Sequence, residues 1–225
     1  CTNLKSIEFL NGIVSIDRYS FAQTYLTSIT FKNSDATIGN YAFYNYTSLN
    51  TIEFLNGVSI SIGNGTFSYC TNLRKFTCSS ENISIGSMAF SDCKYLTKVE
   101  LSNGKVYVGS NAFIKCANLA NFTVANGGAS IGIHAFEDCI NLRSVTVTGG
   151  NNSISEEAFK NCINLQHVTF TGQTSSIGIR AFSDCVSLSS IKFLKEVDEI
   201  KDSAFEKCEL LTTATFEEGI NSIGN

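Results

Sequence analysis

The chain has 225 residues, of which 43% are hydrophobic and 16% are charged, and its formal net charge is −4. This composition is typical of a folded protein and excludes a disordered chain. The small charge excludes a nucleic-acid-binding surface of the usual kind, which requires a clustered basic face. No apolar run approaches the roughly 18 residues that a membrane span needs.

Nine phenylalanines recur along the chain at a nearly constant spacing, which is 22, then 24, and then 23 six times. They are Phe21, Phe43, Phe67, Phe90, Phe113, Phe136, Phe159, Phe182 and Phe205. A period of this size is typical of a solenoid, in which each repeat buries its apolar side only against its neighbours. We therefore expect one continuous domain over residues 1–225, built of about ten coils. The repeat is already under way at residue 1 and is interrupted at residue 225, so we expect an internal piece of a longer protein with both caps missing.

Each coil begins with a leucine that is followed by a short alternating segment, as in Val145-Thr146-Val147. Alternation of β-branched or aromatic residues with polar ones predicts a strand with one buried face. Asn-Gly or Gly-Gly pairs then predict a sharp turn. Because strands of successive coils stack about 4.8 Å apart, they predict a parallel sheet, which we expect on the concave side of a curved array.

The rest of each coil carries Ser-Ile-Gly, then Ala-Phe, then Cys, as in residues 130–139. The Ala-Phe segment predicts one helical turn, so short helical or irregular turns are expected on the convex side. The predicted fold class is therefore an α/β solenoid. All seventeen phenylalanines occupy inward positions of this pattern, which assigns them to the core rather than to a ligand site.

The strand pattern Leu-x-x-Ile-x-Phe resembles the strand segment of leucine-rich repeats. The pattern Ser-Ile-Gly-x-x-Ala-Phe-x-x-Cys-x-x-Leu resembles the variant found in BspA-like surface proteins, and this resemblance covers essentially the whole chain. It implies a non-catalytic adhesion protein at the microbial cell surface, outside the cell, that binds host matrix proteins, cell-surface proteins or glycans. The chain departs from the family pattern by lacking proline and by carrying Gln23 and Tyr46 where the cysteine is expected.

Eight of the nine cysteines stand three residues before the leucine of a coil, and Cys78 takes an inward strand position. The eight are Cys1, Cys70, Cys93, Cys116, Cys139, Cys162, Cys185 and Cys208. Equivalent side chains of stacked coils point in parallel, so their Cβ atoms lie farther apart than the roughly 3.8 Å of a disulfide. Of the two interpretations, a disulfide ladder and free buried thiols, this geometry favours free thiols. No Cys-x-x-Cys pair is present, so these residues do not predict a metal site.

Only two histidines occur, His134 and His167. The predicted register places neither beside a nucleophile and an orienting acid. We therefore expect no enzyme activity, no catalytic residues, no cofactor and no metal.

Two surfaces are candidates for a partner site. On the first, polar residues two and four positions after each leucine face outward from the expected concave sheet. These candidates are Lys75, Thr77, Lys98, Glu100, Asn121, Thr123, Ser144, Thr146, His167 and Thr169. Binding hot spots favour aromatic residues and arginine, so we expect a broad groove of modest affinity. Cross-strand threonine pairs also stabilise sheets, which leaves a purely structural role as the alternative.

The second candidate surface consists of tyrosines. All eight tyrosines lie within residues 19–107, and most flank the Phe turn. The candidates are Tyr19, Tyr25, Tyr41, Tyr44, Tyr69 and Tyr95. A tyrosine combines an apolar ring with a polar tip, which suits contact with a partner, whereas chance variation among surface positions is the alternative.

Three functions follow as hypotheses. The first is a protein- or glycan-binding module of a surface adhesin, the second is a structural spacer in a surface protein, and the third is a cytosolic scaffold, which free thiols would equally allow. Neither a nucleic-acid partner nor membrane insertion by this segment is expected. Uncapped end coils also predict edge-to-edge self-association.

Overall fold

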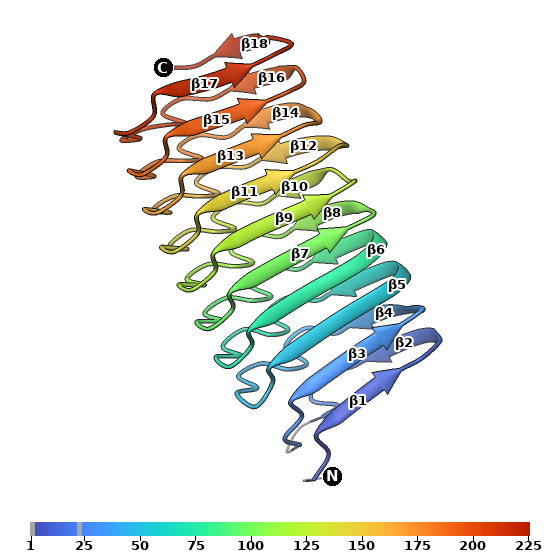
Figure 1. Cartoon of the computed structure of the whole chain (residues 1–225). Coiled ribbons are helices and arrows are strands. Elements are labelled where there is room, and N and C mark those ends of the chain that lie inside the picture. The colour runs from blue at the N-terminus through green and yellow to red at the C-terminus, as the bar shows by residue number, and fades with distance from the viewer. Residues whose placement is uncertain (1–2, 22–23) are drawn as a thin grey trace.

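The computed structural model describes residues 3–21 and 24–225 and is a stack of coils that advances along one axis (Figure 1). Its described residues form eighteen strands with parallel pairing and no helix. The first and last coils lie at opposite ends of the stack. The solenoid completes about nine turns of roughly 23 residues, rather than the ten expected.

The first row of strands starts two residues after the leucine of each coil, as predicted. It comprises β1 (Ser6–Phe9), β3 (Ser28–Lys32), β7 (Lys98–Ser102), β9 (Asn121–Ala125), β11 (Ser144–Val147), β13 (His167–Phe170), β15 (Ser190–Phe193) and β17 (Thr213–Phe216), together with the first halves of β5 (Thr51–Ile62) and β6 (Lys75–Ile85). Each strand pairs in parallel with the equivalent strand of the next coil. Thr146, for example, lies opposite Thr123 on one side and Thr169 on the other, so side chains with the same place in the repeat form columns.

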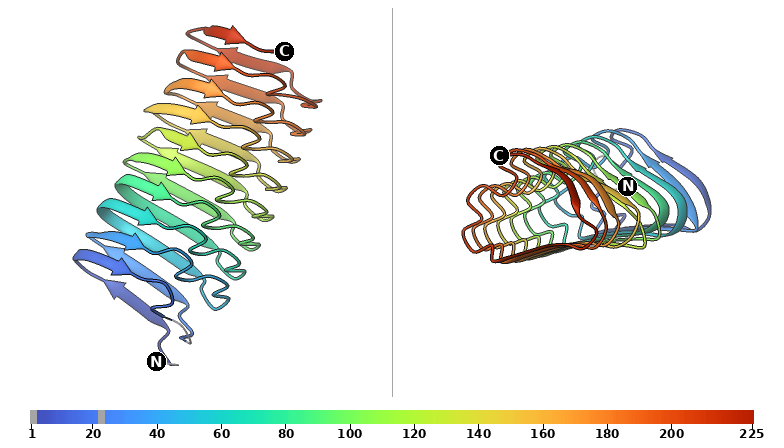
Figure 2. Two further views of the ribbon diagram at one scale, coloured as in Figure 1. Left: turned by 180° about the vertical axis from the view of Figure 1, so that it is seen from behind. Right: turned by 90° about the horizontal axis from the view of Figure 1, so that it is seen from above.

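A second row of strands occupies the opposite side of the solenoid, where short helical or irregular turns were expected. It comprises β2 (Gly12–Ile16), β4 (Ser34–Ile38), β8 (Lys105–Val108), β10 (Ala129–Ile131), β12 (Asn151–Ile154), β14 (Gln173–Ile177), β16 (Val197–Ile200) and β18 (Ile220–Ile223), together with the second halves of β5 and β6. The Ser-Ile-Gly segments form these strands because they also alternate, with Ile83 and Ile85 buried and Ser84 exposed. The two rows form the two long sides of each coil when the stack is seen from above (Figure 2). That the first row is concave stays a prediction.

The Ala-Phe segment is a turn rather than the predicted helical turn. Its backbone N–H groups do not bond carbonyls four residues earlier, as a helix requires. Instead Asn111, Phe113 and Lys115 donate to carbonyls of the next coil, at N–O distances of 2.9, 2.8 and 2.9 Å. Asn111 and Lys115 have φ of 58° and 59°, and this left-handed backbone turns alternate N–H groups toward the next coil. The N–H groups between them, of Ala112 and Ile114, bond carbonyls three residues earlier in the same turn, both at 3.2 Å, so bonding between coils alternates with bonding within the turn.

The phenylalanines of these turns form one continuous stack through the core. The ring of Phe136 lies 5.1 Å from that of Phe113 and 5.0 Å from that of Phe159, nearly parallel to both. All three side chains are fully buried. Burial of such large apolar groups is the main source of stability in a solenoid, because each coil supplies the surface that covers the next.

The cysteine column lies beside this stack, and the eight cysteines among the described residues are free, as predicted. Each thiol of the column donates a hydrogen bond to the carbonyl of the phenylalanine one coil earlier, as Cys139 does to Phe113 with an Sγ–O distance of 3.1 Å. Burial raises the pKa of Cys70 to about 12, which keeps the thiol protonated and able to donate. The predictions for Cys1 and Gln23 lie outside the described residues.

Tyr46, which replaces the cysteine in one coil, likewise donates a hydrogen bond to the phenylalanine carbonyl of the preceding coil. Its hydroxyl donates to the carbonyl of Phe21, at 3.4 Å, and accepts from the backbone N–H of Leu26, at 3.3 Å. Its ring packs edge-on against Phe43, with centroids 5.7 Å apart. Tyr46 is therefore a structural residue. Among the described residues, no helix has the length and apolar character needed to cross a bilayer.

Candidate partner-binding surfaces

The face of the first row carries all ten residues predicted from the sheet, in two adjacent columns. One column runs Lys75, Lys98, Asn121, Ser144 and His167, and the other runs Thr77, Glu100, Thr123, Thr146 and Thr169. The threonines are half-buried, whereas both lysines are exposed. Thr77, Glu100 and Thr123 line a shallow groove across β5, β6, β7 and β9. The predicted register is thus confirmed, and the structure brings these side chains onto one face.

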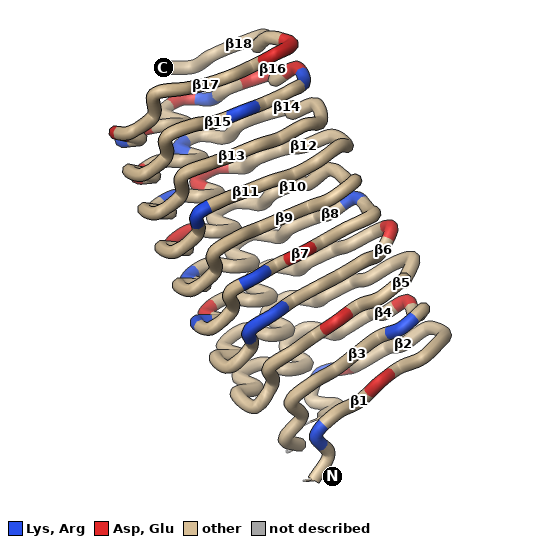
Figure 3. The backbone as a smooth tube through the Cα atoms, in the orientation of Figure 1, with Lys and Arg blue, Asp and Glu red and all other residues tan. Residues whose placement is uncertain are grey.

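The charges on this face are paired with one another. Lys75 Nζ lies 3.2 Å from Glu53 Oε1, and Lys98 Nζ lies 2.8 Å from Glu100 Oε1. The two lysines are themselves direct neighbours in the sheet, so the acids offset a like-charge contact that would otherwise destabilise it. Basic and acidic residues are interspersed along the stack rather than gathered on one face (Figure 3). The lysines therefore offer little uncompensated charge to a partner.

Polar groups farther along the same face also bond across the strands. Ser144 Oγ donates to Asn121 Oδ1 at 2.7 Å, and His167 Nδ1 lies 2.9 Å from Ser190 Oγ. A partner must compete with these hydrogen bonds. This supports the structural role that the sequence left open for the polar ladder.

A linked group of aromatic side chains lies on the turn side of the first coils. The Arg18 guanidinium carbon sits 4.7 Å from the ring centre of Tyr19 and 5.3 Å from that of Tyr41. The ring centroids of Tyr41 and Tyr44 are 6.0 Å apart, and those of Tyr44 and Tyr69 are 5.7 Å apart, both edge-on. We call Arg18, Tyr19, Tyr41, Tyr44 and Tyr69 the tyrosine edge. The sequence predicted these tyrosines as exposed candidates without predicting any contact between them. In the structure each of the five side chains contacts at least one other, and the contacts run across successive coils.

Gly65 fixes how Tyr41 lies within the tyrosine edge. A Cβ added at Gly65 would stand 2.4 Å from Cε1 of Tyr41, so only glycine lets that ring lie over the next coil. All four tyrosines of the edge remain exposed, from 39% for Tyr41 to 60% for Tyr19. Ordered aromatic rings that stay exposed are typical of a surface that meets a partner.

The other two predicted tyrosines lie outside the tyrosine edge. Tyr25 is exposed beneath Lys5, whose Nζ is 5.5 Å from its ring centre. Tyr95 is exposed on the segment before Leu96 and has no ring contact with the tyrosine edge among the described residues. The sequence grouped them with the rest because all flank the Phe turn, but their place in the repeat differs.

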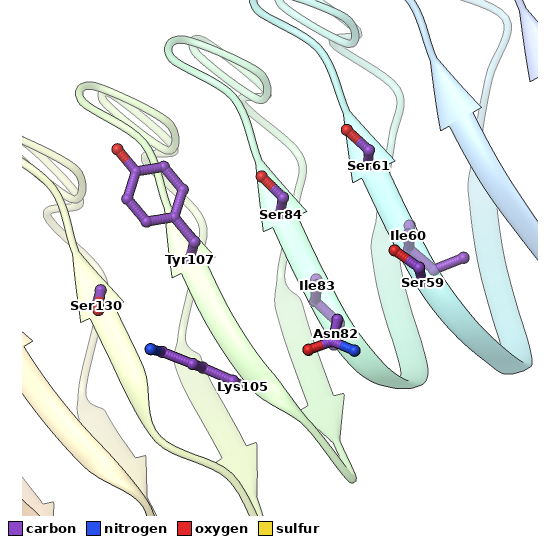
Figure 4. A pocket seen from close by; sticks show the side chains of 9 residues that line it. All are labelled: Ser59, Ile60, Ser61, Asn82, Ile83, Ser84, Lys105, Tyr107 and Ser130. Atoms are coloured by element: carbon purple, nitrogen blue, oxygen red, sulfur yellow. The ribbon is translucent and has the colours of Figure 1, made fainter.

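A second shallow groove, which the sequence did not predict, lies on the face of the second row (Figure 4). Lys105 and Tyr107 project from β8, with Ser84 on β6 and Ser130 on β10 at either side. Tyr107 is 54% exposed. The equivalent residue in both neighbouring coils is a serine. Aligning the coils by their repeat would therefore have singled out Tyr107 as the residue that differs.

One cluster of ionisable groups lies on the turn side farther along the stack. His134 Nδ1 is 3.0 Å from Glu137 Oε2 and 3.4 Å from Glu157 Oε2. Lys160 Nζ is 2.6 Å from that same oxygen of Glu157. Among the described residues, His134, Glu137 and Glu157 are the one group of three with an arrangement that could hold a metal ion. The sequence missed it because its members belong to two successive coils and are separated by a full repeat.

Comparison with known proteins gives one family and two similar structures. The family model described as "BspA type Leucine rich repeat region" matches six copies over residues 1–61, 37–163 and 129–225. A leucine-rich repeat protein from Bacteroides ovatus is 20% identical over 94% of this chain and 78% of its own, with a TM-score of 0.39. A leucine-rich cell surface protein from Faecalibacterium prausnitzii is 16% identical over 96% of this chain and 89% of its own, with a TM-score of 0.41. No curated protein matches.

Proposed function

The chain belongs to the BspA-type leucine-rich repeat family, and we propose that it is a non-catalytic binding module of a microbial cell-surface adhesin, placed outside the cell, whose tyrosine edge contacts a host matrix or cell-surface protein. The family match supports the repeat module and its surface location. The observation that carries the binding role is the tyrosine edge, in which ring and guanidinium contacts hold four exposed tyrosines in one ordered group.

The tyrosine edge fits a protein partner better than the face of the first row does. Tyrosine and arginine are among the residues most enriched in interface hot spots, and the contacts within the edge already restrict the rings. Less side-chain freedom is then lost on binding. The first-row face instead offers half-buried threonines and lysines that are paired with acids, and exposed ion pairs contribute little to affinity.

The test uses substitutions that other coils already carry at the same positions. Tyr41→Asn matches Asn111, Tyr44→Ser matches Ser68, and Tyr69→Asn matches Asn45. Asparagine tolerates the left-handed backbone at positions 41 and 69, where φ is 57° and 60°. The matched control, Lys75→Ser with Lys98→Asn, borrows Ser144 and Asn121 of the same column.

Binding of the purified chain and of both variants is measured on immobilised extracellular-matrix proteins and on a glycan array. We expect the triple tyrosine variant to lose at least about tenfold in affinity for a matrix protein, and the lysine variant to stay within about twofold of the parent. A loss confined to the lysine variant would assign binding to the first row. Binding to glycans alone would contradict a protein partner, and binding to neither would favour a structural spacer.

A further inference from the structure

We propose that His134, Glu137 and Glu157 form a binding site for a divalent transition-metal ion, with zinc as the best-suited ion. His134 and Glu157 hold the same position in successive coils, and both have left-handed backbone, with φ of 55° and 51°. The backbone N–H of His134 bonds the carbonyl of Glu156, at 3.1 Å, which ties the two turns together. Glu137 follows His134 by three residues, and its carboxylate lies beside the imidazole of His134.

The candidate ligand atoms lie close to the spacing found around a tetrahedral ion. Zinc binds imidazole nitrogen and carboxylate oxygen at about 2.0–2.2 Å, which separates neighbouring ligand atoms by roughly 3.3–3.6 Å. His134 Nδ1 lies 3.0 Å from Glu137 Oε2 and 3.4 Å from Glu157 Oε2, and the ligand atoms of all three residues lie within 4.8 Å of one another. A small shift of these side chains would place the three ligand atoms at three of the four tetrahedral positions.

His134 Nδ1 is a buried polar atom without a hydrogen-bond partner among the described residues. Two carboxylate oxygens are close enough to bond it, but neither has the geometry of a hydrogen bond. Leaving such an atom unpaired is unfavourable, and in proteins it commonly marks a bound water or ion. The observation is independent of the ligand spacing, and it points to a species that the nitrogen lone pair can coordinate.

The mixed donor set favours zinc over calcium or magnesium. An imidazole nitrogen suits zinc and its neighbours among the transition metals, whereas calcium and magnesium prefer oxygen ligands alone. Two carboxylates and a neutral imidazole carry a charge of −2, which one divalent ion neutralises. Glu157 is largely buried, whereas His134 and Glu137 are partly exposed, with side-chain exposures of 33% and 22%. Water can therefore supply the fourth ligand.

Lys160 acts as a built-in competitor for the ion. Its ammonium group lies 2.6 Å from Glu157 Oε2 and 4.0 Å from Glu137 Oε1. A lysine ammonium group is charged at neutral pH, so a metal ion must displace it from Glu157. Removing the charge of Lys160 should therefore tighten metal binding, whereas removing a ligand should weaken it.

The test measures binding of zinc chloride to the whole chain by calorimetry, with three single variants. His134→Asn copies Asn111, the equivalent residue one coil earlier, which has φ of 58°, so the fold is expected to persist. Glu137→Gln, at a partly exposed position, is the second ligand variant. Lys160→Met keeps the apolar stem and removes the charge. Circular dichroism checks that each variant is folded.

We expect one zinc ion per chain, at least a tenfold weaker affinity for each ligand variant, and a several-fold tighter affinity for Lys160→Met. Cobalt serves as a spectroscopic probe, because binding to nitrogen and oxygen gives weak visible bands without the charge-transfer band of a cobalt thiolate. A thiolate band would assign binding to cysteine and overturn the proposal. So would an absence of zinc binding, an affinity that the ligand variants leave unchanged, or an affinity that Lys160→Met leaves unchanged or weakens.

Discussion

The first coils and the central coils share one repeat but pack it differently. Phe21 and Phe43 stack with their ring centroids 5.7 Å apart, whereas Phe113, Phe136 and Phe159 stack at 5.0–5.1 Å and within 9° of parallel. The central phenylalanines recur at a constant interval along the chain, whereas the first interval is shorter and the second is longer. Uniform spacing lets equivalent atoms repeat by one translation, and this allows the rings to stack closely.

The two regions also place different hydrogen-bond donors at the cysteine position of the repeat. In the central coils a thiol donates to the carbonyl of the preceding phenylalanine, and in the second coil the hydroxyl of Tyr46 does so. The tyrosine edge lies over the irregular coils, and the cluster around His134 lies over the regular ones. The interior of the repeat therefore keeps its bonding even where its residues change, whereas the turn side carries different chemistry in different coils.

The largest expected effect is a loss of stability at alkaline pH in the cysteine-bearing coils. Burial raises the pKa of Cys78 to about 12, and the pKa of Cys93 and Cys116 well above the ordinary value of 9.0. The unfolded thiols ionise first, so the stabilisation is complete below about pH 9 and is lost as pH rises toward about 12. Each thiol should lower the free energy of unfolding by up to about 1.4 kcal/mol per pH unit there.

Urea unfolding at several pH values from 8 to 10, followed by circular dichroism, measures this slope. The control variant carries Cys93→Ser and Cys116→Ser, because a serine hydroxyl does not titrate in this range. Its slope should be smaller than that of the parent chain. An identical slope would show that tyrosine ionisation or general charge repulsion, rather than the thiol column, sets the alkaline limit.

The second prediction compares phenylalanines of the two regions. Phe136→Ala should lower the free energy of unfolding by about 3–5 kcal/mol, because it opens a cavity in a fully buried stack. Phe21→Ala should cost roughly half as much or less, because Phe21 is only partly buried and has the wider ring spacing. Urea unfolding of both variants tests the difference. Equal losses would mean that the close stacking of the central coils adds nothing.

The third prediction concerns the two ways of bonding the phenylalanine carbonyl. Cys139→Ala removes a buried thiol donor, and Tyr46→Phe removes the hydroxyl that contacts Phe21 and Leu26. Each should lower the free energy of unfolding by about 1–2 kcal/mol, measured by urea unfolding. Cys139→Ser, which keeps a donor of similar size, should recover part of the loss. If Cys139→Ser were no more stable than Cys139→Ala, the contribution of Cys139 to stability would come from packing rather than from the hydrogen bond.

The smallest effect is expected on the face of the first row. Lys98→Met breaks the ion pair with Glu100, but both side chains are about half exposed, at 51% and 44%. The free energy of unfolding, again from urea titration, should therefore change by less than about 0.5 kcal/mol. The same measurement at high salt should give an even smaller difference. A loss above about 1 kcal/mol, the upper end for exposed ion pairs, would show that charge pairing contributes substantially to the sheet.

The outward columns of the first row could be read from the chain because they depend on alternation within a single strand. The buried state of the cysteines followed from their constant place in the repeat. The second row of strands was missed although Ile83, Ser84 and Ile85 alternate, because the Ser-Ile-Gly segment is too short for alternation alone to identify a strand. The groove at Lys105 and Tyr107 was missed for the same reason.

The period, the inward positions and the family follow from patterns along the chain, because these patterns need no knowledge of contacts. The conformation of the Ala-Phe turn and the contacts among surface groups depend instead on how successive coils stack. The turn is not an α-helix because every second N–H group bonds the next coil, and a pattern along the chain does not show a bonding partner that lies one full repeat away. Tyr19 and Tyr41 are also about one repeat apart along the chain, as are His134 and Glu157. Stacking of successive coils, rather than nearness in sequence, brings these groups together.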